Sequence, residues 1–404
     1  MEWIARHPWI RTYHFDDIIN ADWDTVDHGQ NVTLPLVYDP SCSYYGERAV
    51  VDGESINYES YFEYIPFLTD PSDRIPSAKK MGDYETPGTI IFDTWEEIKN
   101  APDGYLKELA EHIFLQSSKI LSLHYNPTFP GDEYGDIGDL WILGKMEANR
   151  IRGVTIITAA AHWAENIKTG KQSSEVVAEA VDLDQDGEKE YVLRNNKIFA
   201  VFENDGGRLQ YLFAYDENKG GIDVIGCNTG IEVPDPEIVG SSVMGEGENG
   251  PRAVSDAFMD RPVGDFDDYD IAVYEYFNDI YSVSVGENYL TFTSSDGEIS
   301  KKISLQEGSN MLVADYQTTT DIIVEMGLSP NFIDMFHYGQ SNMVEISSDG
   351  CYGVENLSGG YAYISFNNMV PREKNDMSPY AWYYSVICDG EFSITLRVGV
   401  QTSA

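Results

Sequence analysis

Apolar residues recur at helical spacing between Asp103 and Ile167, and this pattern predicts two amphipathic helices. The second helix is expected from about Ile137 to Ile167, and Gly153 within it favours a bend because glycine lowers helix propensity by about 1 kcal/mol. Prolines exclude a helix between the two, so an antiparallel helix pair is expected. The apolar positions of the first helix are Leu106, Leu109, Ala110, Ile113, Phe114, Ser117, Ile120 and Leu121.

Beyond a polar linker at residues 169–180, apolar and polar residues alternate in short runs, which is typical of β-strands. Glycine and Asp/Asn turns separate the runs, while residues 228–269 lack periodicity and are expected to form a long loop. The fold class is therefore α+β, a helical segment followed by a large antiparallel β-sandwich of super-sandwich type. The predicted strands are 190–193, 197–203, 209–214, 272–276, 281–285, 290–294, 302–305, 310–317, 322–326, 343–347, 361–366, 382–388 and 392–400.

Residues 1–92 show no sustained period and are rich in Pro, Gly, Tyr and Asp. An irregular ordered region with short helices is expected over residues 31–92. Residues 1–30 contain several large apolar residues, as expected for a segment that connects to another part of a longer protein. Two domains are expected, a mainly helical and irregular segment at 1–168 and a β-sandwich at 169–404.

The 404-residue chain holds 68 acidic and 26 basic residues, a formal net charge of −42. This charge disfavours nucleic acid and anionic membranes as partners, because both require clusters of Lys and Arg. The sequence contains neither a run of about 18 apolar residues nor a signal-peptide pattern. Neutral carbohydrate is unaffected by the charge, and the 27 tyrosines and seven tryptophans suit either sugar contact or a β-sandwich core.

An acidic loop, Asp182–Glu190, carries carboxylates at alternate positions around a glycine. Ca²⁺ binds several oxygen ligands at once, so this D-x-D-x-D-G spacing predicts a structural calcium site; the alternative is a solvated turn without metal. The expected ligands are Asp182, Asp184, Asp186, the backbone carbonyl of Glu188, and Glu190.

The four cysteines show no C-x-x-C spacing, which argues against a structural zinc site. Cys351 and Cys388 either pair as a disulfide or remain buried free thiols, and the pairing of Cys42 and Cys227 is open. His124 and His162 lack a metal-ligand partner at suitable spacing, so each is expected to be a structural histidine. No catalytic carboxylate pair can be selected among 68 candidates.

A series of short motifs runs along the chain: His7–Ile10, Ser122–His124, Ala160–Ala164, Asp182–Tyr191, Phe199–Glu203, Gly206–Leu209, Ala257–Phe258 and Gly327–Pro330. Together these motifs resemble the C-terminal, non-barrel portion of glycoside hydrolase family 57 proteins. The resemblance implies an incomplete β/α barrel, a helical segment and a β-rich domain in retaining enzymes that act on α-glucans. This chain begins at what resembles the exit from the barrel, so neither the catalytic Glu nor the catalytic Asp of the family can be carried over to it.

The resemblance implies a non-catalytic part of an extracellular α-glucan-acting hydrolase, with neutral carbohydrate or the missing catalytic barrel as its partner. Since the family's helical segment closes one side of the sugar cleft, it implies carbohydrate contacts at His124, Trp141, His162 and Trp163, although packing on an apolar stripe also accounts for the two tryptophans. The alternative is a secreted structural or assembly-forming protein, derived from such a hydrolase, that self-associates.

Overall fold

In the computed structural model, every described residue lies in the compact unit Tyr38–Ala404. The expectations for residues 1–30 and for most of 31–92 therefore lie outside the described residues. The described residues are 50–51, 54–55, 87–124, 142–185, 187–226, 256–263, 276, 279–328, 344–348, 351–355, 359–367, 369, 373–377 and 381–401.

Three helices are described: α6 (Ile90–Asn100), α7 (Tyr105–His124) and α8 (Ile142–Lys168). The two longer helices confirm the helical pattern of the sequence, and the apolar positions of α7 from Leu106 to Phe114 are buried against α8 and the neighbouring sheet. Helix α6 was not predicted; its first turn carries Asp93, whose carboxylate accepts the N–H of Gly88 at 3.0 Å.

Helices α7 and α8 are antiparallel, as expected. The first turn of α7 lies near the last turns of α8, since both line one pocket. Gly153 does not interrupt α8. Its missing side chain instead makes room for a strand, since a Cβ at this position would meet the hydroxyl of Tyr211 at 2.3 Å.

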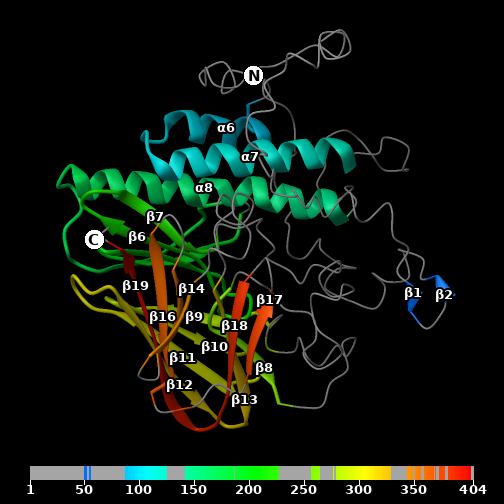
Figure 1. Cartoon of the computed structure of the whole chain (residues 1–404), viewed down its shortest axis with the longest axis vertical. Helices are drawn as coiled ribbons and strands as arrows, with labels where there is room; N and C mark the ends of the chain where they lie inside the picture. The colour runs from blue at the N-terminus through cyan, green and yellow to red at the C-terminus, as the bar shows by residue number, and fades with distance from the viewer. Residues whose placement is uncertain are drawn as a thin grey trace, which may run out of the picture. The chain divides into compact units, whose positions relative to one another are not determined.

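A five-stranded antiparallel meander, in the order β3-β4-β5-β6-β7, packs beneath the helices (Figure 1). One face of it turns Phe199, Val201 and Phe213 toward α7 and α8. The other face turns Ala200, Phe202 and Leu212 into a second core shared with the remaining sheets. Burial on both faces explains the continuous apolar runs of β5 and of residues 211–215 in β6. The strands are Val177–Val181, Glu190–Arg194, Ile198–Phe202, Leu209–Asp216 and Gly220–Ile225.

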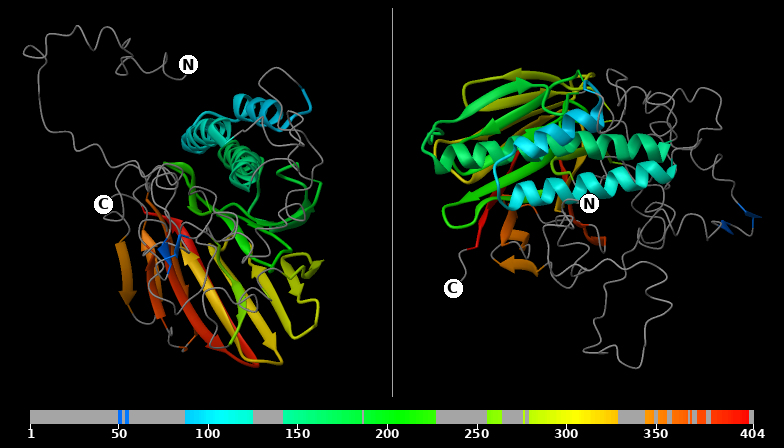
Figure 2. Two further views of the ribbon diagram at one scale, coloured as in Figure 1. Left: turned by 90° about the vertical axis from the view of Figure 1, so that its right-hand side faces the viewer. Right: turned by 90° about the horizontal axis from the view of Figure 1, so that it is seen from above.

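An eight-stranded antiparallel sheet, β14-β15-β16-β19-β12-β11-β10-β9, forms the layer opposite the meander (Figure 2). Its inner strands alternate buried and exposed residues, as the sequence predicted. The strands are β9 Ser282–Val285, β10 Tyr289–Thr293, β11 Ile299–Leu305, β12 Met311–Thr318, β14 Val344–Ser348, β15 Cys351–Glu355, β16 Gly360–Ser365 and β19 Glu391–Val400.

A four-stranded sheet, β17-β18-β13-β8, shares the core of the eight-stranded sheet. A backbone bridge pairs Leu209 of the meander with Ala257, which lies just before β8 of this sheet. Every strand pair in the described part of the chain is antiparallel, so this part is α+β and rich in β-structure. The strands are β8 Met259–Pro262, β13 Ile322–Leu328, β17 Glu373–Met377 and β18 Ala381–Cys388, and a separate hairpin joins β1 Val50–Val51 to β2 Glu54–Ser55.

Two expectations about irregular segments are wrong. The predicted polar linker contains most of β3, and the predicted loop at 228–269 contains β8. Both strands carry charged residues, which obscured the alternation of apolar and polar residues in the sequence. Strands β7, β15 and β17 were also missed, and the predicted strand at 272–276 lies, except for Tyr276, outside the described residues. None of the described helices is long and apolar enough to cross a membrane.

Candidate functional site

The acidic loop joins the antiparallel strands β3 and β4, whose pairing ends at Val181 opposite Glu190. Ligand oxygens of Asp182, Asp184 and Glu190 lie within 4.8 Å of one another. The loop turns sharply at Gln185 and Gly187, which have φ angles of 61° and 101°. The alternation seen in the sequence thus brings together three of the predicted metal ligands.

Backbone and helix contacts hold these carboxylates in place. Glu190, only 2% exposed, accepts the N–H groups of Leu183 and of Asp184, the latter at 3.3 Å. Asp182 accepts the N–H of Gly187 at 3.2 Å. Asp184 pairs with Arg152 of α8 at 3.1 Å. The loop is therefore tied both to itself and to the helical layer.

Of the two remaining predicted ligand residues, only Glu188 is among the described residues. Asp186 lies outside the described residues, and Glu188 is exposed in the same loop with its carboxylate outside the cluster of three. A second contact to the helix comes from Thr155, whose hydroxyl donates to the carbonyl of Leu183 at 2.8 Å. The clustered donors are all carboxylate oxygens, which fits a hard cation such as Ca²⁺ better than a soft metal.

The four predicted carbohydrate-contact residues are not gathered in the described structure. Trp141 lies outside the described residues, and His124 is the last residue of α7, with its side chain also outside them. His162 is exposed on α8. Trp163 is 3% exposed, and its indole N–H donates to the carbonyl of Asn195 at 2.7 Å, so it packs between α8 and the turn after β4.

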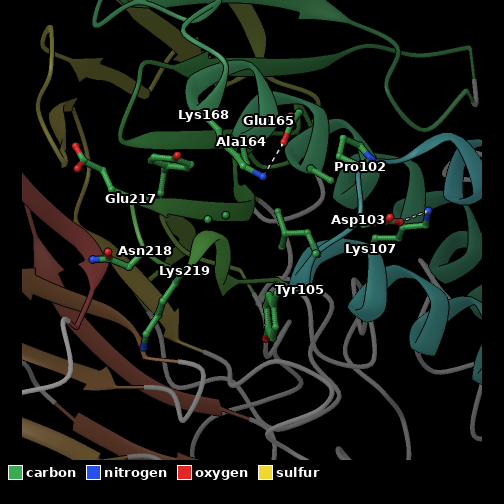
Figure 3. Close-up of a pocket in the computed structure, with 16 residues that line it drawn as sticks. Pro102, Asp103, Tyr105, Lys107, Ala164, Glu165, Lys168, Glu217, Asn218 and Lys219 are labelled. Carbon is green, nitrogen blue, oxygen red and sulfur yellow. Dashed lines mark hydrogen bonds and ion pairs between the residues drawn. The ribbon is translucent and has the colours of Figure 1, made fainter. Parts of the chain in front are cut away.

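A pocket of about 180 Å³ opens where the α6–α7 turn, the end of α8 and the β6–β7 hairpin meet (Figure 3). Tyr105 and Tyr215 lie in its wall, and Gly220 and Gly221 add only backbone. The Tyr105 hydroxyl donates to Asp223 at 2.7 Å, and the Tyr215 ring packs edge-on against Trp163 at 6.2 Å. Sequence reasoning missed this pocket, because its three segments are far apart in the chain.

A buried charge cluster in the sheet core was also missed. Lys301 of β11 is 0% exposed, and its ammonium donates to Asp260 of β8 at 2.7 Å and to the carbonyls of Phe258 and Gly206 at 2.6 and 2.9 Å. Burial lowers the pKa of Lys301 and raises that of Asp260, although their attraction opposes both shifts. Lys301 lies on the same face of β11 as the buried Ile299 and Ile303, two residues from each. This spacing was the feature of the sequence that could have predicted its burial.

Cys388 is a buried free thiol, one of the two states left open by the sequence. Burial, reinforced by the nearby Asp260 carboxylate, raises the pKa of its thiol to about 12. Its sulfur lies 3.4 Å from that of Met369. The neutral thiol therefore packs as an apolar side chain.

No protein-family model matches the sequence, and no curated protein matches it either. Among solved structures, the chain is similar to a 4-alpha-glucanotransferase from Thermococcus litoralis, with 14% identity over 86% of this chain and 58% of that one and a TM-score of 0.37. It is also similar to YidC from Thermotoga maritima, with 13% identity over 55% of this chain and 51% of that one and a TM-score of 0.30.

A third similar structure is a galactose mutarotase related enzyme from Lactobacillus acidophilus, with 8% identity over 53% of this chain and 98% of that one and a TM-score of 0.33. The chain spans between half and three-fifths of the length of the glucanotransferase and of YidC. Similarities this remote do not establish a shared activity.

Proposed function

We propose that this chain is the non-catalytic helical and β-sandwich portion, of super-sandwich type, of an extracellular α-glucan-acting hydrolase resembling glycoside hydrolase family 57. Its partners are neutral carbohydrate or the catalytic barrel of that enzyme, and neither nucleic acid nor a membrane. The observation that carries this proposal is the acidic loop, which is part of the motif series and joins the helical layer to the sheets through Arg152 and Thr155.

One Ca²⁺ bound by Asp182, Asp184 and Glu190, with Asp186 and the carbonyl of Glu188 completing the ligands, has a structural role in this proposal. Three carboxylates this close repel one another, and a divalent cation relieves that repulsion. An ion bound by the folded state alone stabilises it by RT ln(1 + [L]/Kd), about 2.7 kcal/mol at a hundredfold excess over Kd. Calcium therefore fixes the loop against α8 and strengthens the contact between helices and sheets.

Removal of calcium tests the structural role. EDTA is expected to lower the melting temperature of the wild-type protein, and Asp182→Asn is expected to abolish most of this sensitivity. Asp182 is exposed and contacts Gly187 within its own loop, so the substitution leaves the Arg152–Asp184 pair intact. Metal analysis of untreated protein is expected to find about one calcium per chain.

Glu188→Gln is the matched control, because it removes the same charge from the same loop at an exposed carboxylate outside the cluster. It should retain the response to EDTA. A calcium-free native protein, or equal responses in both variants, contradicts the proposed metal site.

The absence of catalysis is tested separately. Purified protein is expected to release no reducing ends from pullulan or maltooligosaccharides while binding maltooligosaccharides in a titration. Sustained hydrolysis that a single carboxylate substitution abolishes would show that the chain carries its own acid and nucleophile.

A structural, self-associating protein is the second candidate function. The observation that favours it is the outer position of β9 in the eight-stranded sheet, where Val285 is 41% exposed on a strand that lacks charge and proline. Outer strands without such protection tend to pair with other chains.

A further inference from the structure

The pocket beside the β6–β7 hairpin is bounded by two adjacent glycines with different roles. A Cβ at Gly221 would meet the side chains of Leu106 at 2.7 Å and Ala164 at 2.9 Å, so this glycine permits close packing of the helices on β7. A Cβ at Gly220 would meet nothing within 4 Å. Gly220 therefore borders open space, where a ligand can approach the backbone.

The charges around this pocket balance, in contrast to those of the whole chain. Two of the opposite pairs are in contact, at 3.0 Å between Asp103 and Lys107 and at 3.4 Å between Glu165 and Lys168. Three acidic and three basic residues line the pocket, so its formal charge is zero in a chain of charge −42. They are Asp103, Glu165, Glu217, Lys107, Lys168 and Lys219.

The size and the chemistry of the pocket fit one small ring with several hydroxyl groups. Its volume of about 180 Å³ exceeds the ~150 Å³ of a cavity that holds benzene. Each hydroxyl of a sugar donates one hydrogen bond and accepts others, and interleaved carboxylate, ammonium and amide groups supply both partners. Figure 3 shows Glu165 and Lys168 on one side of the pocket and Glu217, Asn218 and Lys219 of the hairpin on the other.

We propose that this pocket binds a single uncharged pyranose unit, such as the end of an α-glucan chain. Lys168 donates to its hydroxyls, Glu165 accepts from them, and the ring of Tyr215 supplies an apolar surface. The inference rests on the proposed carbohydrate role and adds to it a place and a ligand class. It makes the helix–hairpin junction, and not His162 or Trp163, the point of sugar contact.

Maltotriose is the probe for a titration followed by ligand-observed NMR, which detects weak binding. Wild-type protein is expected to bind it saturably, and to bind glucose more tightly than glucosamine or glucuronate, because a charged sugar upsets the balanced charges. Lys168→Met is expected to weaken maltotriose binding by about tenfold, or about 1.4 kcal/mol. Lys171→Met is the matched control, since it removes the same charge from an exposed lysine just beyond α8 that does not line the pocket.

A second variant tests whether the ligand occupies the open space beside Gly220. Gly220→Asn tolerates the positive φ of 81° and adds a side chain where nothing lies within 4 Å, so it should block binding without lowering the melting temperature much. Maltotriose binding that is unchanged in both pocket variants overturns the pocket and leaves the carbohydrate role standing. A wild-type protein that binds no maltooligosaccharide overturns both.

Discussion

Lys301 shows how single residues fix the packing of the sheets. Its ammonium joins β11 to β8 through Asp260 and the carbonyl of Phe258, and the rings of Tyr281 and Tyr316 lie 5.2 and 5.8 Å from its nitrogen. Tyr281 also donates to Asp260 at 3.1 Å. A buried ammonium is tolerated only where such partners replace water.

Substitution of Lys301 by methionine is expected to destabilise the protein by about 3–5 kcal/mol, because it leaves the Asp260 carboxylate buried without its cation. Adding Asp260→Leu should recover much of this loss, since the double variant buries neither charge. Urea unfolding of the two single variants and the double variant measures the coupling. Additive losses would show that the two residues act independently.

At the scale of the element, α8 depends on the shape of the strand beneath it. Glycine is ordinarily unfavourable within a helix, yet Gly153 lies against the Tyr211 side chain of β6, whose ring carbon bearing the hydroxyl is 3.3 Å from the site of a Cβ. The helix–sheet interface therefore selects glycine against its intrinsic propensity.

Gly153→Ala is consequently expected to destabilise the protein by about 1–3 kcal/mol, although the same change stabilises an isolated helix by about 1 kcal/mol. Removing the clashing oxygen with Tyr211→Phe in the same chain should restore most of the loss. Thermal unfolding of the single and double variants measures both effects. A stabilised Gly153→Ala variant would contradict the tight contact.

Element β8 shows why part of the fold was not predictable from the sequence. Asp260 forms a buried ion pair with Lys301, and Arg261 a partly buried one with Glu325; nearby Asp256 pairs with Arg208. A segment this charged reads as a surface loop unless the partners on distant strands are known. The longer helices and the alternating strands β10, β11 and β12 were predictable, because their apolar spacing is local.

The candidate sites differ in the same way. The acidic loop was predictable because its ligands lie within nine residues of one hairpin. The pocket was not, since residues 102–107, 161–168 and 215–221 meet only after the helices have packed on the meander. For Trp163 the sequence left sugar contact and packing on an apolar stripe both open; in the structure its indole N–H donates to the carbonyl of Asn195 and its ring packs against Phe199.

At the scale of the whole molecule, the charge of −42 opposes close approach of two copies of the chain. Two apolar cores hold the helical layer, the meander and the opposite sheets together. Ion pairs contribute as well, and several of the few basic residues take part in them. Repulsion between copies is screened over about 10 Å at 0.1 M salt and about 3 Å at 1 M. Any association through apolar strand edges must therefore strengthen with salt.

If the chain is assembly-forming, light scattering should show particles that grow as the salt rises from about 0.01 M to 1 M, over which the screening length falls tenfold. Val285→Lys is expected to abolish this growth, because a lysine on the outer strand β9 opposes pairing with a second copy. Ile387→Lys is the matched control: Ile387 is equally exposed at 41%, but its strand β18 lies between β17 and β13 and offers no free edge. Growth lost in both variants would point to general apolar adhesion, and a particle size that stays constant across the salt series would exclude the assembly function and leave the carbohydrate role as the remaining candidate.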